Sequence, residues 1–384
     1  MTEPLRAVWL GPGEHTVPVH LRTAMEHGAV LIVQAGDDAE LTRYFDAIAA
    51  LALRPPLLVV SASPALQARG AELGVAHWLP APPGDWDAAL AWTRLQHERS
   101  TGLQRKLDDR RWTERAKGCL MAAQSLDEAQ AHKLLRDTAM HARLQLTQVA
   151  QSVVHAAQLA EAVNRAGQQR MLSQRLVKLM AQRAAGIEPR RAKVLQDESA
   201  ARLEANLMRL HELLAEELPG AALPPLREAW TRLAPCLTGK PDAAKLAEAS
   251  AAATLLLAAA EALTQTLVES GARPPLRLLN ICGRQRLLSQ RIAMRALLAG
   301  GRSAQDEADF AAALDELEAA PLSDTATRAL LAEVRAEWLH LLHALRHGGS
   351  NASAAALARS SELLLTQLDA LTLRYQQSLQ TLLS

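Results

Sequence analysis

Hydrophobic and polar residues alternate in two different ways along the chain. In about the first ninety residues, short apolar runs are separated by helical stretches such as Asp38–Leu53 and Pro64–Leu73. The apolar runs are Leu5–Leu10, Ala29–Val33, Leu57–Ser61 and His77–Leu79. This alternation is typical of βαβ units, which build a parallel sheet covered by helices. Beyond about Asp85 helix follows helix, so we predict a mainly α protein with a small α/β domain over residues 1–96.

Glycine and proline mark the breaks between the predicted helices. The breaks fall at Gly186–Pro189, Pro219–Pro225, Pro235–Pro241, Gly271–Pro275, Gly300–Ser303, Ala320–Asp324 and His347–Ser350. By contrast, the stretch from Leu144 to Ala185 contains no proline, and its only glycine is Gly167. A single helix over this stretch would be about 60 Å long.

A twelve-residue segment occurs twice. Residues 164–175, NRAGQQRMLSQR, return as residues 280–291, NICGRQRLLSQR, with eight identical positions and an offset of 116 residues. The break at Gly186 recurs beside Gly301 at nearly the same offset. We therefore predict a duplicated four-helix domain over residues 161–384.

On a helix, each copy of the segment places a glycine and an arginine on one face. The two stripes are Val163, Gly167, Arg170, Gln174 and Val177, then Leu279, Gly283, Arg286, Gln290 and Ala293. The glycine removes the side chain that would keep a ligand or a second backbone away. The arginine needs a partner, because an unpaired buried charge is costly.

Two arginines from equivalent helices would face each other, and an anion between them would let both charges share that space. A planar oxyanion suits the paired donors of a guanidinium. The candidate ligand site comprises Arg170, Arg286, Gly167, Gly283, Gln174 and Gln290. The alternative is that each arginine pairs with a Glu or Asp of a neighbouring helix.

The pattern Asn-x-x-Gly-x-x-Arg-[Met/Leu]-x-Ser-x-Arg resembles the P-box of nitrate- and nitrite-sensing helical domains. Its spelling here is most similar to that of type IV pilus-like chemotaxis transducers. In those domains the arginine three residues after the glycine contacts the anion, which implies Arg170 and Arg286. The resemblance thus implies nitrate or nitrite as the ligand, whereas the residues by themselves indicate a small oxyanion.

The middle of the chain carries the strongest basic tilt. Residues 97–155 hold 10 basic and 7 acidic side chains, against 6 and 10 in residues 1–96. The pattern predicts three short helices, with Asp127 and Gln130 forming a capping box. We expect Leu134, Leu135 and Met140 to be buried against Leu120 and Val149. A solvated helical surface would account for the charges without any ligand.

Two further motifs, Glu114-Arg-Ala-Lys-Gly-x-Leu-Met121 and the spacing from Ala131 to Met140, resemble the ANTAR domain. This is a three-helix RNA-binding domain of bacterial transcription antiterminators, which implies RNA hairpins as partners. Arg143 stands where the family often has Asn. The segment Leu95–Arg110 would be the helical stalk through which such proteins dimerise, so we expect a homodimer or higher oligomer. The candidate RNA contacts are Arg115, Lys117, Lys133, Arg136 and Arg143.

ANTAR domains often follow a response-regulator receiver, and residues 1–96 fit a shortened one. A phosphorylated receiver needs an acidic Mg²⁺ cluster and an aspartate at a strand end. Here Gln34 follows the run Ala29–Val33, and Asp37 and Asp38 serve equally well as a helix cap. We expect a degenerate receiver used for packing or dimerisation, with the stalk and ANTAR domain over residues 97–160.

Other function classes find little support. The net charge is +1, the three cysteines are far apart, and Met1–Leu10 lacks the pattern of a signal peptide. The longest apolar run, Ala251–Ala260, is too short to span a bilayer. We expect a cytoplasmic protein without membrane contact, catalytic site, metal or cofactor.

These patterns together predict a nitrate- or nitrite-responsive one-component regulator. It would bind RNA hairpins and cause transcription antitermination of nitrate-assimilation genes. The alternative is an ANTAR antiterminator controlled by a partner protein, with the helical domain as a docking platform.

Overall fold

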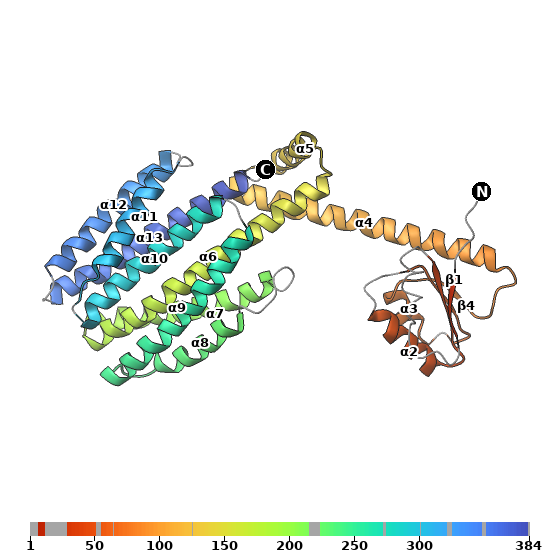
Figure 1. Ribbon diagram of the computed structural model, residues 1–384, viewed down its shortest axis with the longest axis horizontal. Coiled ribbons are helices and arrows are strands. Elements are labelled where there is room, and N and C mark those ends of the chain that lie inside the picture. Colours follow the sequence, from red (N-terminus) through yellow and green to blue (C-terminus); the bar gives the residue numbers. More distant parts are fainter. Residues whose placement is uncertain are drawn as a thin grey trace. The chain divides into compact units, whose positions relative to one another are not determined.

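The computed structural model describes residues 7–11, 29–50, 55–63, 65–124, 126–214, 223–271, 274–299, 301–320, 325–347 and 351–382. The chain divides into two compact units, Met1–Arg111 and Trp112–Ser384. The division falls inside one helix, α4 (Trp86–Gln124). A small parallel sheet belongs to the first unit and the rest is helical, which confirms the mainly α fold class (Figure 1).

The sheet of the first unit has four parallel strands in the order β1-β2-β3-β4. The strands are β1 (Ala7–Leu10), β2 (Val30–Gln34), β3 (Leu57–Val60) and β4 (Val75–Leu79), with helices α2 (Asp38–Ala49) and α3 (Gln67–Glu72) between them. Successive side chains of a strand point to opposite faces. Leu31 and Val33 pack with Phe45 of α2, whereas Ile32 packs with Leu90 of α4. Both faces are therefore covered, which explains why β2 and β3 are continuous apolar runs.

The second unit begins with a three-helix module made of the end of α4, α5 (Glu128–Ala142) and the start of α6 (Leu146–Ala184). Asp127 accepts the N–H of Gln130 at 2.8 Å and the Gln130 side chain accepts the N–H of Asp127 at 3.0 Å, which confirms the predicted capping box. The module's core is formed by Ala116, Leu120, Ala131, Leu135, Ala139, Val149, Ala150, Val153 and Val154.

One expectation for this core was wrong. Met140 is 65% exposed. The buried face of α5 runs through Ala131, Leu135 and Ala139, four residues apart. Met140 follows Ala139 directly, and one residue turns the helix by about 100°, so its side chain leaves the core.

Helix α6 continues without a break from this module into the repeated segment. It spans 39 residues, Leu146–Ala184, which confirms the single long helix predicted there. Figure 1 shows it as one continuous helix, yellow at its start and yellow-green at its end.

Two groups of four helices follow in the same order. The first contains α6, α7 (Pro189–Leu214), α8 (Leu223–Cys236) and α9 (Ala243–Gly271). The second contains α10 (Pro274–Ala299), α11 (Ala304–Glu318), α12 (Thr325–Arg346) and α13 (Asn351–Leu382). Each group has its own hydrophobic core, and α6 packs directly against α10.

Helix α9 is more apolar than the sequence pattern indicated. By length and composition, Ala243–Ser270 is the one stretch of the described residues that passes as a membrane span. In the bundle, its side chains Leu256 and Leu263 lie in the core of the first group.

Candidate functional site

The two repeated segments meet where α6 crosses α10. A Cβ on Gly167 would lie 3.7 Å from the Cα of Gly283, and the reverse distance is also 3.7 Å. The same Cβ positions lie 2.9 to 3.6 Å from Nη2 of both Arg170 and Arg286. The glycines therefore let the backbones approach and leave room for two guanidinium groups at one crossing.

The arginines exchange hydrogen bonds between the two helices. Nη2 of Arg170 donates to Oδ1 of Asn280 at 2.8 Å, and Nη2 of Arg286 donates to Oδ1 of Asn164 at 2.9 Å. Asn164 and Asn280 are the first residues of the two copies. The repeat thus builds a pseudo-symmetric site, because each copy supplies an arginine that donates and an asparagine that accepts from the arginine of the other copy. Each asparagine stands three residues before the glycine of its copy, and this spacing is the sequence signal that assigns it to the site.

Carboxylates from the last helix of each group balance the two charges. Nη1 of Arg170 pairs with Oε2 of Glu261 in α9 at 2.9 Å. Nη1 of Arg286 pairs with Oδ1 of Asp369 in α13 at 2.8 Å. These are the ion pairs of the alternative interpretation.

The pairing leaves one nitrogen of each guanidinium, Nε, without a partner in the described part of the chain. Both side chains are 1% exposed. Among the described residues, neither Nε finds a hydrogen-bond partner. A buried donor without a partner costs about 1–3 kcal/mol, so two such donors at one crossing are unusual in a purely structural cluster.

The arginines at the crossing keep their charge although burial disfavours the charged form. Burial lowers the pKa of the Arg170 guanidinium, Glu261 raises it, and the nearby Arg286 lowers it further. An arginine nevertheless stays protonated in proteins. The site is therefore a fixed pair of positive charges that requires negative groups beside it.

The two candidate glutamines lie one turn further along their helices, away from the arginine donors. Nε2 of Gln174 donates to Oγ of Ser173 at 3.2 Å. Gln290 accepts from Nζ of Lys178 at 2.6 Å and donates to the Ser361 carbonyl at 2.7 Å. Both glutamines therefore hydrogen-bond to neighbouring groups, and neither hydrogen-bonds to the arginine pair.

Lys178 is a buried cation that the sequence did not single out. It is fully buried and pairs with Glu362 of α13, which Arg175 also contacts, through Nη2 to Oε2 at 2.5 Å. Burial opposes ionisation of Glu362, but Lys178 and Arg175 outweigh it and hold the pKa of this carboxyl at about 2. The comparison of the two copies gives no signal for Lys178, because Met294 stands at the corresponding place in the second copy.

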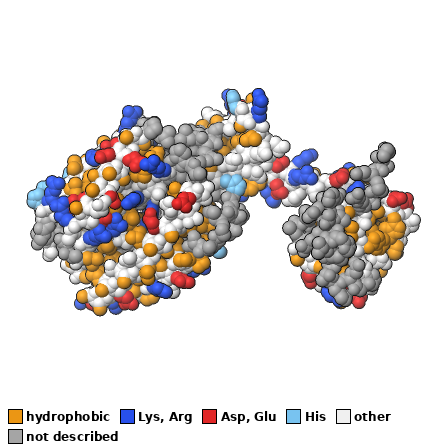
Figure 2. Space-filling view, in the orientation of Figure 1, with side chains coloured by type: hydrophobic (Ala, Val, Ile, Leu, Met, Phe, Trp, Pro, Cys, Tyr) orange, Lys and Arg blue, Asp and Glu red, His pale blue; other side chains and the backbone are white. Residues whose placement is uncertain are grey.

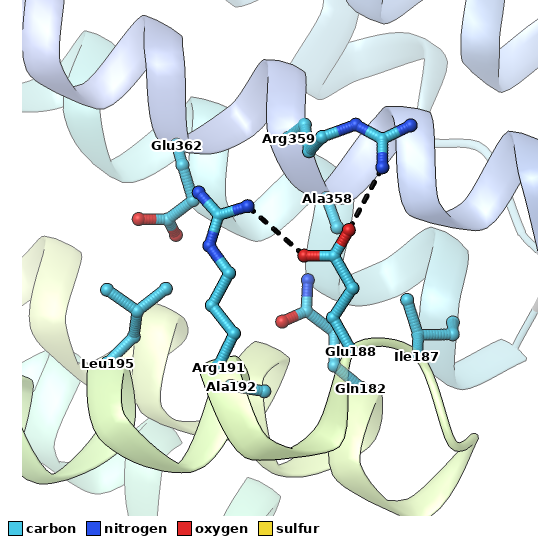
Figure 3. A pocket seen from close by; sticks show the side chains of 9 residues that line it. All are labelled: Gln182, Ile187, Glu188, Arg191, Ala192, Leu195, Ala358, Arg359 and Glu362. Carbon is cyan, nitrogen blue, oxygen red and sulfur yellow. Dashed lines mark hydrogen bonds and ion pairs between the residues drawn. The ribbon is translucent and has the colours of Figure 1, made fainter.

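A small cleft opens beside Glu362 (Figure 3). Glu188 spans it, accepting from Arg191 at 3.1 Å and from Arg359 at 2.9 Å. Its enclosed space of about 10 Å³ holds roughly one water molecule. The cleft is therefore too small for more than a water molecule, and its charged groups are paired with one another.

The candidate RNA contacts differ in accessibility. Arg115, Lys133, Arg136 and Arg143 are exposed on the three-helix module. Lys117 is buried, and its Nζ pairs with Glu114 at 2.8 Å and with Glu128 at 2.7 Å, which raises the pKa of the amine. Its assignment as an RNA contact is corrected to a link between α4 and α5.

Arg143 ends α5 in the left-handed conformation, with φ of 56°. Asn and Gly adopt this conformation more readily than other residues. The backbone thus explains why an Asn at this place suits a domain of this type. It leaves the Arg143 side chain exposed.

Other chemistry is sparse in the described part of the chain. Asp37 caps α2 by accepting the N–H of Glu40, and β2 ends at Gln34. No three of the described His, Cys, Asp and Glu residues are grouped to hold a metal. On the face drawn in Figure 2, basic and acidic side chains are interspersed over the helical region.

Comparison with protein families locates two known domains. Residues 101–154 match the ANTAR domain. Residues 155–267 match the N-terminal region of type IV pili methyl-accepting chemotaxis transducers. No curated protein and no solved structure matches the chain. The two matches meet at residues 154 and 155, inside α6, so this helix joins a region that matches the ANTAR domain, an RNA-binding domain of antitermination regulators, to a region that matches the pilus transducers.

Proposed function

We propose that the protein is a cytoplasmic one-component regulator that binds nitrate or nitrite between Arg170 and Arg286. In response, its ANTAR domain would bind RNA hairpins and cause transcription antitermination of nitrate-assimilation genes. The observation that carries the proposal is the crossing of α6 and α10. There, two buried arginines meet over two glycines, each with an unused Nε–H. A small planar oxyanion accepts several such donors at once.

Helix α6 supplies the route for the signal. It is the third helix of the RNA-binding module and also carries Arg170. An anion that binds one arrangement of α6 and α10 more tightly than another shifts the population toward that arrangement. A shift or rotation of α6 then changes how the ANTAR helices present Lys133 and Arg136 to RNA. We propose that the protein acts as a homodimer or higher oligomer through the exposed stalk, with the α/β unit as a degenerate receiver, and without catalysis or a cofactor.

Calorimetric titration tests the ligand. The purified full chain is titrated with nitrate, nitrite, chloride and sulfate, beside Arg170→Ala/Arg286→Ala. A matched control, Arg190→Ala/Arg232→Ala, removes two exposed arginines from α7 and α8. We expect saturable nitrate or nitrite binding that the first variant loses and the control keeps. No binding of any of the four anions would refute the sensing function.

RNA binding with and without the anion tests the output. The probe is a synthetic RNA with two short-loop hairpins. We expect the anion to change the affinity of the wild type and not that of Arg170→Ala/Arg286→Ala. The alternative, control by a partner protein docked on the helical domain, is favoured by the ion pairs to Glu261 and Asp369. It predicts that the double variant and the wild type respond alike.

A further inference from the structure

The charges at the crossing of α6 and α10 already cancel. Arg170 and Arg286 contribute two buried positive charges, and Glu261 and Asp369 contribute two negative ones, while the half-exposed Arg202, which also pairs with Asp369, is screened by water. A monovalent anion added to this set would leave one negative charge unbalanced in a buried place, which is costly. An anion therefore enters readily only if one carboxylate withdraws.

The two carboxylates are not equally free to withdraw. The side chain of Glu261 is 53% exposed, so its carboxylate reaches water by a rotation of the side chain. The side chain of Asp369 is 29% exposed and also pairs with Nη2 of Arg202 in α7 at 3.3 Å. Asp369 thus remains anchored when Arg286 changes partner, whereas Glu261 pairs with Arg170 alone among the described residues.

We infer that Glu261 is a built-in competitor for the anion, and this inference rests on the proposed function. In the ligand-free protein, Glu261 occupies Nη1 of Arg170. The anion displaces it, and the occupied site then holds two arginines, Asp369 and one anion, whose charges cancel. Nη1 of Arg170 then becomes available in addition to the unused Nε, which shares an edge of the guanidinium with the Asn280-bound Nη2, and such charged donors suit the oxygens of a small anion.

The exchange also changes what holds α6. In the ligand-free state, the pair between Arg170 and Glu261 ties α6 to α9. In the occupied state, Arg170 binds the anion shared with α10, and α9 loses this tie. The competitor thus sets the anion concentration at which the regulator responds, and it places the first structural change in α9.

Titration of Glu261→Gln with sodium nitrate and sodium nitrite tests the inference. Glutamine keeps the shape of the side chain and removes its charge. The matched control is Glu269→Gln, which removes an equal charge from an exposed place on the same helix. We expect Glu261→Gln to bind the anion on the order of tenfold more tightly than the wild type, and Glu269→Gln to stay within about twofold.

Amide hydrogen exchange locates the change. In the wild type, saturating nitrate should raise the exchange rate in α9 around Glu261 and leave α13 around Asp369 unchanged. In Glu261→Gln, the α9 segment should exchange quickly before the anion is added. Equal affinity of Glu261→Gln and the wild type, or a response confined to α13, would overturn the competitor role while leaving the sensor intact. If neither form binds any small oxyanion, the sensing function itself is refuted.

Discussion

The two halves of the helical domain share a repeated segment but use it differently. In both, glycine, arginine and asparagine build the same half of the crossing. One to two turns further along α6 and α10 the halves diverge. In the first half, Arg175 and Lys178 reach Glu362 of α13, across the domain. In the second half, Arg291 pairs with Asp306 of the adjacent α11 at 2.5 Å, and Met294 replaces the lysine.

This difference separates two tasks. The repeated residues make a symmetric place where two cations meet, which requires a copy from each half. Lys178, which the second copy replaces with Met294, joins Arg175 and Glu362 in one buried ion cluster that holds the halves together and breaks the symmetry. The duplicated domain thus keeps two equal halves of one site, whereas the ion cluster that connects the halves occurs once.

The largest expected effect comes from removing the connection. Glu362→Gln leaves Lys178 buried without a carboxylate, and breaking a buried pair this way costs about 3–5 kcal/mol. Urea unfolding of this variant should show that loss, whereas Glu198→Gln on the exposed face of α7 should show almost none. Lys178→Met, which copies the second half, should cost less because Arg175 still pairs with Glu362. A smaller loss in Glu362→Gln than in Lys178→Met would contradict the cluster described here.

Acid should weaken the same connection. The pKa of Glu362 is about 2 in the folded protein and 4.5 is its ordinary value, so the carboxylate stabilises the fold at pH above about 4.5. As the pH falls from about 4.5 to 2, this contribution of about 3 kcal/mol is progressively lost. Unfolding free energies of the wild type and Glu362→Gln should therefore converge over this range. Parallel curves would show that Glu362 is not the titrating group.

The asparagine exchange tests the symmetric part. Asn164→Ala and Asn280→Ala each remove an acceptor from a buried guanidinium, which costs about 1.5–3 kcal/mol. The two losses should be nearly equal in urea unfolding. Asn164→Ala should cost slightly more, because Asn164 also donates to Gln376 at 3.1 Å. A several-fold difference between the variants would mean that the two copies are not equivalent.

The glycines should give the smallest effect on folding and a clear one on binding. A Cβ on Gly283 would lie 2.9 Å from Nη2 of Arg170, whereas a Cβ on Gly167 meets the nearest atom at 3.4 Å. Alanine favours the helix by about 1 kcal/mol over glycine, which offsets the strain. We expect Gly283→Ala to weaken anion binding about tenfold and Gly167→Ala less. Gly102→Ala in α4, where nothing lies within 4 Å, is the control and should leave anion binding unchanged.

The sequence predicted those parts of the molecule that depend on local periodicity. The fold class, the long helix α6, the capping box at Asp127 and the facing of Arg170 and Arg286 all follow from spacing along one or two helices. Glu261 and Asp369 could not be assigned, because they lie 91 and 83 residues from their arginines and carry no motif. The burial of Lys117 could not be predicted, because it depends on the packing of α4 against α5 and on Glu128 of that next helix, although its other partner, Glu114, lies three residues away.

Because α6 is uninterrupted, the number of residues between the RNA-binding module and the arginine crossing fixes how the two are rotated relative to each other about the helix axis. A flexible linker would absorb insertions of any length. In a single helix, each inserted residue turns everything beyond it by about 100° and advances it by about 1.5 Å. Seven inserted residues restore the original facing to within about 20°. Length variation between residues 154 and 163 is therefore expected to be quantised, with heptad steps tolerated and single residues disruptive.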